Sequence, residues 1–418
     1  MAKPMAGKPP TCHGHKAEAM KNNTRSKNSP HWGDATKLVR GGLERSPFGE
    51  TSEALYLNSG FVYDAPETAE ARFSGQDDGY VYGRYGNPTV SMFEERLALL
   101  EGAEACYGVA SGMAAVYGAL ACQLKTGDHI VASKALFGSC YQIITNILPR
   151  FGITYTLVDG NDLKAWEAAF TSDTKAVFLE TPSNPTLQIV DIAAVGELAK
   201  KHHASFVVDN IFATPILQKP LEMGADVIVY SGTKHMDGQG RVLGGAIVST
   251  KQFKDELLKP FLRHTGPSLS PFNAWVLLKG LETLKLRVEA QSEAAESIAE
   301  HLSAMKAVSR VSYPTLASHP GSDIAKRQMK SGGTMVTFEV EGGKKAAFEV
   351  LRNLRLVDIS NNLGDAKSLM THPASTTHRN IGPEARAMMG ITDGMLRLSV
   401  GLEDLKDILD DVKAAVQG

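Results

Sequence analysis

The chain has little cysteine, almost no net charge and no long apolar run. Its 418 residues contain four cysteines without paired-motif spacing, so we expect reduced and mostly buried thiols: Cys12, Cys106, Cys122 and Cys140. The 44 basic and 46 acidic residues give a formal charge of −2, which indicates no general attraction to nucleic acid or membrane surfaces. No apolar run approaches the ~20 residues of a membrane-spanning helix, and the N-terminus lacks a signal-peptide core. We therefore predict a cytoplasmic protein.

Composition divides the chain into an arm and two domains. Residues 1–30 are rich in Lys, Asn, Pro and Gly, which is typical of a flexible segment. The motif Cys12-His13-Gly14-His15 lies there, but no second ligand cluster completes a metal site, so we predict none. We expect an N-terminal arm over 1–75, a large domain over 76–270, and a C-terminal domain with a linking helix over 271–418.

Short β-branched runs alternate with helical segments between about 100 and 255. The predicted strands are 129–133, 154–158, 176–180, 205–209, 227–230 and 246–249, and 191–203 is one of the intervening helices. The runs are apolar throughout, as in strands covered on both faces. The alternation predicts an α/β domain with a mostly parallel sheet. A long helix over 272–306 should lead to a smaller α/β unit, with strands at 334–340, 356–359 and 396–400 and a final helix at 403–416.

Polar side chains gather where three of the predicted strands end. Glu180 and Asn184 follow one strand, Asp209 closes another, and Ser231 and Lys234 follow a third. In open α/β sheets, ligands bind beyond the carboxyl ends of the strands. We therefore predict one shared site.

The segment Tyr230-Ser231-Gly232-Thr233-Lys234-His235, read with Asp209, indicates a pyridoxal 5'-phosphate (PLP) site. Lys234 would carry the cofactor on its amino group, because burial beside a cationic ring lowers a lysine pKa. The hydroxyls of Ser231 and Thr233 would bind the phosphate. Asp209 would pair with the ring nitrogen, since a buried carboxylate needs a partner. Taken singly, Lys234 reads as a solvated charge and Asp209 as a turn or cap residue; their combination favours the cofactor.

Three further segments contain candidate binding residues. Ser111-Gly112-Met113 opens a helix over 112–125, whose free N–H groups suit phosphate, although Ser111 can equally be a simple N-cap. The irregular stretch 80–89 contains Tyr82 and Arg84, and it could bind phosphate or another protein. Arg397 lies within an apolar strand and requires an anionic partner, either a substrate carboxylate or a structural acid.

Together these stretches resemble the cystathionine γ-synthase-like family of PLP-dependent enzymes of cysteine and methionine metabolism. The resemblance runs from about Thr36 to the C-terminus. It rests on Tyr-x-Tyr-Gly-Arg-Tyr-Gly-Asn-Pro-Thr (80–89), Ala-Ser-Gly-Met-Ala-Ala (110–115), Glu-Thr-Pro-Ser-Asn-Pro (180–185), Val-Asp-Asn-Ile-Phe-Ala-Thr-Pro (208–215) and Ser-Gly-Thr-Lys (231–234). It implies the fold-type I architecture and a homotetramer built from two dimers with shared active sites.

The resemblance also implies roles for the candidate residues. Tyr82 and Arg84 would reach the phosphate bound in the neighbouring subunit. Asn184 would lie near the cofactor's 3-hydroxyl and the substrate carboxylate, which Arg397 would clamp. The phosphate would be held within one subunit by residues from two segments, namely Ser111, Gly112, Met113, Ser231 and Thr233.

Departures from relatives point to a particular reaction. Phe137 stands where many relatives stack a tyrosine on the cofactor, so acid–base work would fall on Lys234. Ser139 replaces the cysteine of methionine γ-lyases, and Asn361 stands where cystathionine-forming or -cleaving relatives often have Glu. Arg241, in Gly-Gln-Gly-Arg-Val, would recognise a distal succinyl carboxylate, or equally bind a loop carbonyl or neighbouring subunit.

The resemblance implies a γ-replacement in which sulfide displaces succinate from O-succinyl-L-homoserine, giving L-homocysteine in methionine biosynthesis. The alternatives are a cystathionine γ-synthase, with cysteine as the nucleophile, a methionine γ-lyase, or a non-catalytic relative. The intact Lys234, Asp209 and Arg397 argue against the last. A nicotinamide site is disfavoured, since Gly238-x-Gly240 follows no strand–helix dinucleotide pattern.

Overall fold

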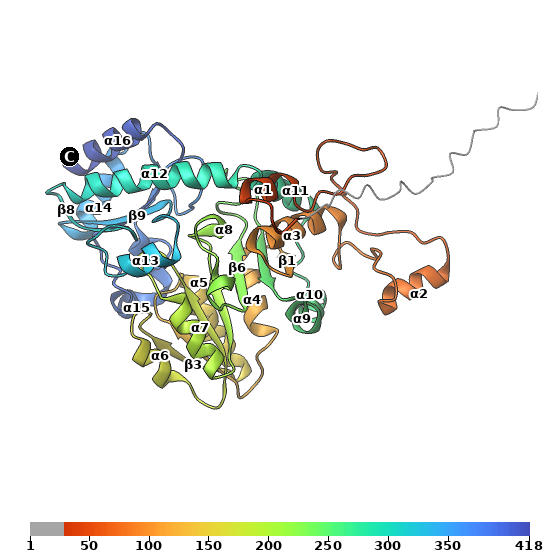
Figure 1. The fold of residues 1–418 in the computed structure, drawn as a ribbon. Coiled ribbons are helices and arrows are strands. Elements are labelled where there is room, and N and C mark those ends of the chain that lie inside the picture. Colours follow the sequence, from red (N-terminus) through yellow and green to blue (C-terminus); the bar gives the residue numbers. More distant parts are fainter. Residues whose placement is uncertain (1–28) are drawn as a thin grey trace, which may run out of the picture.

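The computed structural model describes residues 29–418 and is built around two sheets (Figure 1). The metal-binding motif considered at 12–15 lies outside the described residues, as does nearly all of the expected flexible segment 1–30. The large sheet has seven strands: β1 (Ala105–Val109), β2 (His129–Ser133), β3 (Thr154–Val158), β4 (Thr174–Glu180), β5 (Ser205–Asp209), β6 (Val227–Ser231) and β7 (Gly245–Ser249). The small sheet has five: β8 (Val308–Ser312), β9 (Met335–Val340), β10 (Asp358–Ile359), β11 (Leu369–Thr371) and β12 (Met395–Ser399).

The large sheet has the order β1-β7-β6-β5-β4-β2-β3. Strands β2 to β6 run parallel, and β7 is antiparallel to both of its neighbours. The predicted mostly parallel sheet is therefore confirmed, although β1 was not predicted. The small sheet has the order β10-β11-β12-β9-β8 and is mostly antiparallel. Of its strands, β8 and β11 were not predicted.

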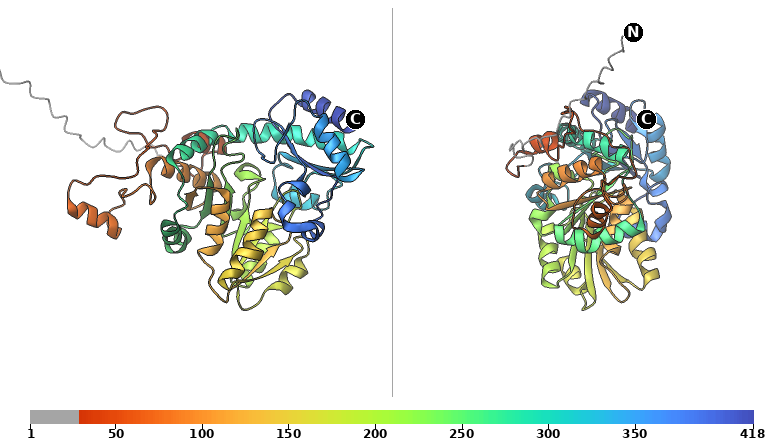
Figure 2. Two further views of the ribbon diagram at one scale, coloured as in Figure 1. Left: turned by 180° about the vertical axis from the view of Figure 1, so that it is seen from behind. Right: turned by 90° about the vertical axis from the view of Figure 1, so that its right-hand side faces the viewer.

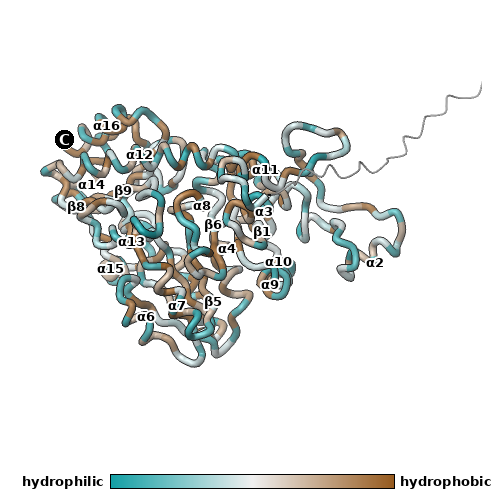
Figure 3. Tube along the Cα trace, viewed as in Figure 1, coloured by the Kyte–Doolittle hydropathy of each residue, from teal (hydrophilic) through white to brown (hydrophobic). Residues whose placement is uncertain are grey.

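Helices cover both faces of the large sheet because its central strands are apolar at successive positions. Val177 and Leu179 of β4 pack toward α7 (Ile192–Lys201) and α6 (Leu163–Ala169), whereas Phe178 packs toward α4 (Gly112–Ala121). Neighbouring side chains of a strand point to opposite faces, so a strand buried twice needs no polar alternation. Figure 3 shows the apolar tube at β5 and β6 inside this layering.

The edge strand β3 departs from the predicted continuous apolar pattern. Its first two residues, Thr154 and Tyr155, are exposed, and only Val158 is buried. The reason is its place at the end of the sheet order, beside β2 alone.

The remaining helices mostly lie against the sheets, whereas α2 stands apart from them (Figure 2). They are α1 (Asp34–Arg40), α2 (Pro66–Ser74), α3 (Pro88–Glu101), α5 (Gly138–Gln142), α8 (Thr214–Leu217), α9 (Lys251–Phe253), α10 (Lys259–Thr265), α11 (Pro271–Leu281), α12 (Leu284–Ser303), α13 (Ser322–Gln328), α14 (Gly343–Asn353), α15 (Gly382–Met388) and α16 (Leu405–Gln417). Short 3₁₀ or π turns occupy Ile143–Ile147, Leu148–Phe151, Pro220–Met223, Lys254–Leu258, Pro373–Ser375 and Arg379–Ile381.

The single long helix predicted over 272–306 is instead two helices, α11 and α12, which meet at residues 282–283. Arg287 bridges this break. Its guanidinium donates to the Gly280 carbonyl at 2.8 Å and to Thr283 Oγ1 at 3.1 Å. A third bond, to the His235 carbonyl at 2.7 Å, ties this junction to the residue after Lys234.

Residues before α3 form an extended arm whose middle lies away from the body. In Figure 1, α2 stands apart from the body on this part of the arm, and none of its residues is buried. Large apolar side chains on the arm are exposed, including Phe48 at 94% and Val62 at 93%. Folding of one chain therefore leaves apolar surface on the arm uncovered.

Buried Arg96 fastens the root of the arm to the body. Its guanidinium, which is fully buried, pairs with Glu53 and donates to the carbonyls of Gly41 at 2.7 Å and Leu278 at 3.2 Å. Lys279 also pairs with Glu53, at 2.8 Å. One side chain of α3 thus connects the arm with α11.

In the part of the chain that the structure describes, no helix has the length and apolarity to cross a membrane. The three described cysteines, Cys106, Cys122 and Cys140, are free thiols, two of them buried, as predicted.

Replacing Arg96 with Met should lower the free energy of unfolding by about 3 kcal/mol, because one partner of a buried ion pair and two carbonyls lose their donor. The melting temperature should fall accordingly in a thermal scan. The control is Lys406→Ala, which removes an exposed pair with Asp410 on α16 and should leave the melting temperature unchanged. Equal effects from both variants would show that Arg96 does not hold the arm.

Candidate active site

The predicted site residues lie at the carboxyl ends of three neighbouring parallel strands. β4 ends at Glu180, β5 at Asp209 and β6 at Ser231, and Glu180 is aligned with Asp209 in the register of the sheet. Lys234 follows β6 directly. The carboxyl ends of parallel strands meet at one edge, which explains why residues distant in sequence assemble here.

Glycines allow the start of α4 to approach the end of β6. A Cβ at Gly112 would lie 2.6 Å from Ser231 Cβ, and one at Gly245 would lie 2.1 Å from the Ser111 carbonyl oxygen. Ser111 caps α4, its hydroxyl accepting from the Ala114 amide at 3.1 Å. The free amides of this helix end, including that of Met113, therefore face the segment that contains Ser231, an arrangement that fits a phosphate group.

Thr233 lies at the other side of this cradle. Its hydroxyl both donates to the Gly244 carbonyl, at 3.3 Å, and accepts from the Gly244 amide, at 3.2 Å. The loop that leads to Lys234 is thereby held against the start of β7.

Asp209 is a buried carboxyl that lacks a cationic partner among the described residues. It accepts one backbone bond, from Ile211 at 3.0 Å, and burial raises its pKa to about 7. An oxygen of Asp209 and one of Glu180 lie within 4.8 Å of each other, together with Cys140 Sγ. A pyridinium N–H would supply the missing positive partner, so this site fits the ring of PLP.

Glu180 performs a role that the sequence did not reveal. Its two carboxyl oxygens accept from the amides of Phe137, at 2.8 Å, and Asn184, at 2.6 Å. Burial, and then the neighbouring Asp209, raise the pKa of Glu180 well above its usual range. One carboxyl thus positions both the residue predicted to stack on the cofactor and the residue predicted to face the substrate.

Arg397 is buried in the middle of β12 and forms no ion pair with a described acid, although the carboxyl of Glu180 is near enough to act on its pKa. It donates to Asn184 Oδ1 at 2.8 Å and to the carbonyls of Asn361 at 3.0 Å and Asn362 at 3.1 Å. Its Nε has no hydrogen-bond partner, and burial lowers the pKa of Arg397 to about 10. The structural acid considered from sequence is absent from its described contacts. A guanidinium held this way is prepared to bind an added carboxylate.

Lys234 reaches the same place from the large sheet. Its Nζ donates to Asn362 Oδ1 at 2.6 Å, and burial, with a smaller contribution from Arg397, lowers its pKa to about 8. Asn362 was not among the predicted site residues. Asn361 was predicted, but only its carbonyl contacts Arg397, and the residue itself is exposed.

Arg241 is bound to its own loop. Its Nε donates to Asp237 Oδ1 at 2.8 Å and a terminal nitrogen donates to the Asp237 carbonyl at 3.0 Å, while 40% of the side chain is exposed. This is the loop-binding alternative considered from sequence, and it leaves part of the guanidinium facing outward.

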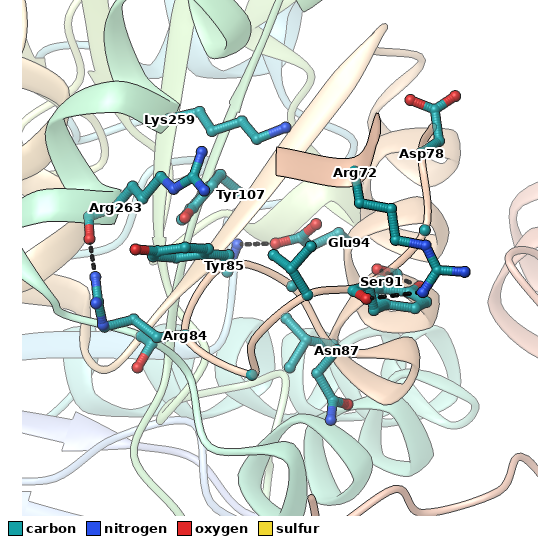
Figure 4. A pocket seen from close by; sticks show the side chains of 18 of the residues that line it. Arg72, Asp78, Arg84, Tyr85, Asn87, Ser91, Glu94, Tyr107, Lys259 and Arg263 are labelled. Atoms are coloured by element: carbon teal, nitrogen blue, oxygen red, sulfur yellow. Dashed lines mark hydrogen bonds between the residues drawn. The ribbon is translucent and has the colours of Figure 1, made fainter. Parts of the chain in front are cut away.

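Arg84 lies on a separate surface (Figure 4), and the Tyr82 ring centre is 5.4 Å from its guanidinium. Arg84 bonds the Arg263 carbonyl of α10 and lies 4.7 Å from the Tyr85 ring centre, and the Arg263 guanidinium covers the same ring at 3.7 Å. Arg84, Tyr85 and Arg263 border a cavity of about 490 Å³ between the arm, α3 and α10. None of its described lining residues comes from the segments of Lys234, Asp209 or Arg397. Within one chain, Tyr82 and Arg84 are therefore not part of the strand-end site.

His378 was also missed by the sequence analysis. It is fully buried, with its ring edge-on to Phe137 at 6.2 Å between ring centres and its Nδ1 2.8 Å from Thr377 Oγ1. Burial, and then Arg397, lower its pKa to about 4. A neutral ring therefore supports Phe137 from behind. Sequence spacing could not show this, because the segment before α5 and the turn that contains His378 are far apart along the chain.

Comparison with known proteins agrees with this geometry. The family described as Cys/Met metabolism PLP-dependent enzymes matches residues 35–417. An O-succinylhomoserine sulfhydrylase of Mycobacterium tuberculosis is 57% identical, covering 91% of this chain and 95% of its own. An L-methionine gamma-lyase of Porphyromonas gingivalis is 42% identical, covering 91% and 96%. A solved O-acetylhomoserine (thiol)-lyase structure from Campylobacter jejuni, which contains N'-pyridoxyl-lysine-5'-monophosphate, is 34% identical with a TM-score of 0.89, covering 93% of this chain and all of its own.

Stability should fall as pH decreases from 6.5 to about 4, in part because of His378. Its pKa is lower in the folded chain than in the unfolded one, so the unfolded state binds more protons in that window and gains relative stability. The contribution is at most about 3 kcal/mol. Melting temperatures between pH 4.5 and 7 should therefore vary less for His378→Gln than for the wild type. Replacing exposed His301 with Gln should keep the wild-type slope; an unchanged slope in His378→Gln would contradict the assignment.

Proposed function

The chain belongs to the Cys/Met metabolism family of PLP-dependent enzymes, and we propose that it is an O-succinylhomoserine sulfhydrylase. Its reaction would convert O-succinyl-L-homoserine and sulfide to L-homocysteine and succinate, as a step of methionine biosynthesis. The observation that carries the proposal is the convergence of Lys234, Asp209 and Arg397, which forms no ion pair with a described acid, at the strand ends of the large sheet. The 57% identity with the M. tuberculosis sulfhydrylase selects this activity within the family.

The residues divide the work of binding. Ser111, Gly112, Met113, Ser231 and Thr233 would hold the cofactor phosphate. Asp209 would keep the ring nitrogen protonated, and Phe137 would stack on the ring. When bound, PLP withdraws electrons from the carbon atoms that lose protons, so the chemistry it supplies is carbanion stabilisation. Arg397 and Asn184 would orient the substrate by its α-carboxylate.

Lys234 would move the protons. Its pKa of about 8 leaves a useful fraction of the amine neutral near physiological pH, so it can accept a proton from Cα and later deliver one. Phe137 has no ionisable group, and this leaves Lys234 to serve Cβ as well. Succinate would leave from Cγ, where sulfide then adds.

Arg241 is proposed to favour the succinyl group. The Asp237 contacts fix its guanidinium at the loop, and its exposed portion could meet the distal carboxylate of a succinyl ester. Arg241→Ala should then reduce kcat/KM for O-succinyl-L-homoserine about tenfold while changing that for O-acetyl-L-homoserine little. Initial rates with both esters check this. An unchanged ratio of the two kcat/KM values would leave Arg241 with only its structural bonds to Asp237.

The proposed assembly is a cytoplasmic homotetramer, a dimer of dimers in which Tyr82 and Arg84 serve the neighbouring subunit's phosphate. Two observations support it. Both residues lie apart from the strand-end site of their own chain, and the arm exposes Phe48 and Val62 almost completely. Apolar surface of this kind is usually covered by a partner.

The 42% identical methionine gamma-lyase makes elimination the second candidate activity, and cystathionine synthesis uses the same first half of the reaction. Purified enzyme should be given O-succinyl-L-homoserine with sulfide and cysteine in competition, and its products separated. Mostly homocysteine is expected. Mostly cystathionine would make it a γ-synthase, and only 2-oxobutyrate with ammonia would make it a lyase. Lys234→Ala should give none of these products and should lose the absorption band of lysine-bound cofactor.

A further inference from the structure

The amine of Lys234 is held by a residue of the C-terminal domain. Its Nζ donates to Asn362 Oδ1 at 2.6 Å, and this is the amine's one hydrogen bond to a described residue. The two residues are 128 positions apart, so the contact exists only because the small sheet packs over the strand ends of the large one. Both residues are half-buried, and a hydrogen bond shielded from much of the solvent is stronger than one in open water.

The segment 360–364 holds Asn362 rigidly. The Asn362 amide donates to Ser360 Oγ at 3.2 Å, and its carbonyl accepts from Arg397 at 3.1 Å. Gly364 donates to Ser399 Oγ at 2.9 Å, and Leu363 is buried. Two residues of β12, Arg397 and Ser399, therefore position the backbone of the segment that contains Asn362.

Gly364 fixes this segment against the lysine loop. It has a φ of +69°, and a Cβ there would lie 2.7 Å from the His235 amide nitrogen. Only glycine tolerates both the left-handed backbone and this close approach. The backbone beside Lys234 and the backbone beside Asn362 are thus packed directly on each other.

An amide at this position suits an amine that must both bind and release a proton. Asn362 Oδ1 accepts a hydrogen bond from a neutral or a charged amine and does not itself ionise. A carboxylate in its place would favour the ammonium form and so raise the pKa of Lys234. The uncharged acceptor therefore orients Lys234 without holding it protonated.

We propose that Asn362 is a positioning residue for proton transfer: it accepts a hydrogen bond from Lys234 Nζ whenever that nitrogen is not bonded to the cofactor, and so keeps it within reach of the substrate's Cα. The inference rests on the proposed use of Lys234 as the proton carrier. Arg397 bonds the carbonyl of the same Asn362, so carboxylate binding and lysine placement share one backbone segment. Asn362 does not contact substrate in this role; it acts through Lys234.

The test is exchange of the Cα proton of L-methionine in D₂O, followed by proton NMR with cofactor-loaded enzyme. This partial reaction needs the lysine and the cofactor but neither an acyl leaving group nor sulfide. Asn362→Ala should retain the cofactor absorption band and lower the exchange rate at saturating methionine about 10- to 100-fold, the usual effect of a misplaced base. Lys367→Ala, an exposed change on the same loop, should exchange at the wild-type rate.

The isosteric variant Asn362→Asp separates positioning from a merely structural role. The pH at which its exchange rate increases should be higher than in the wild type by about one pH unit or more, because the new carboxylate stabilises the ammonium form of Lys234. A uniform loss of rate with an unmoved pH profile would overturn the proposal, as would wild-type exchange by Asn362→Ala. If the wild type exchanges methionine but makes no homocysteine from O-succinyl-L-homoserine, the proposed function fails, while loss of exchange in Asn362→Ala still supports the role of Asn362.

Discussion

Burial of ionisable groups at the carboxyl ends of β4, β5 and β6 is the constraint on which the site depends. Asp209 and Glu180 are side by side in the sheet register, and water is excluded from both, so both pKa values rise. Desolvation acts in the opposite direction on the cations and lowers the pKa of Lys234 and of Arg397. Low solvent access thus leaves Asp209 in need of a cationic partner and Arg397 in need of an anion. It also allows the Lys234 amine to be neutral.

Such groups are costly to bury unless neighbouring residues satisfy them, and the structure provides these neighbours from both domains. Glu180 orders two backbone segments, at Phe137 and at Asn184. Arg397 gathers Asn184 with the carbonyls of the segment that contains Asn362. The domains are therefore joined by the same hydrogen bonds that align the site, and the small sheet acts as a wall of the active site.

The junction of α11 and α12 also helps to position the loop that contains Lys234. Arg287 closes the gap between these helices and also holds the carbonyl of His235, the residue after Lys234. Gly280 permits the approach, since a Cβ there would lie 2.1 Å from the Met236 carbonyl oxygen.

Local sequence patterns were sufficient for the cofactor and the sheet. Apolar runs that end in Glu180, Asp209 and Ser231 identify parallel strands and their functional ends, because strand formation and burial are read over a few residues. The interruption at residues 282–283 was not predicted, because the helical pattern of 272–306 continues through it. The contacts of Asn362 with Lys234, Glu180 with Phe137, and His378 with Phe137 join residues 128, 43 and 241 positions apart. Sequence alone identified Lys234, Asp209 and Arg397 as the candidate groups for the chemistry; only tertiary packing decided how they are held, because each of those contacts is made between segments that propensity and periodicity treat as independent.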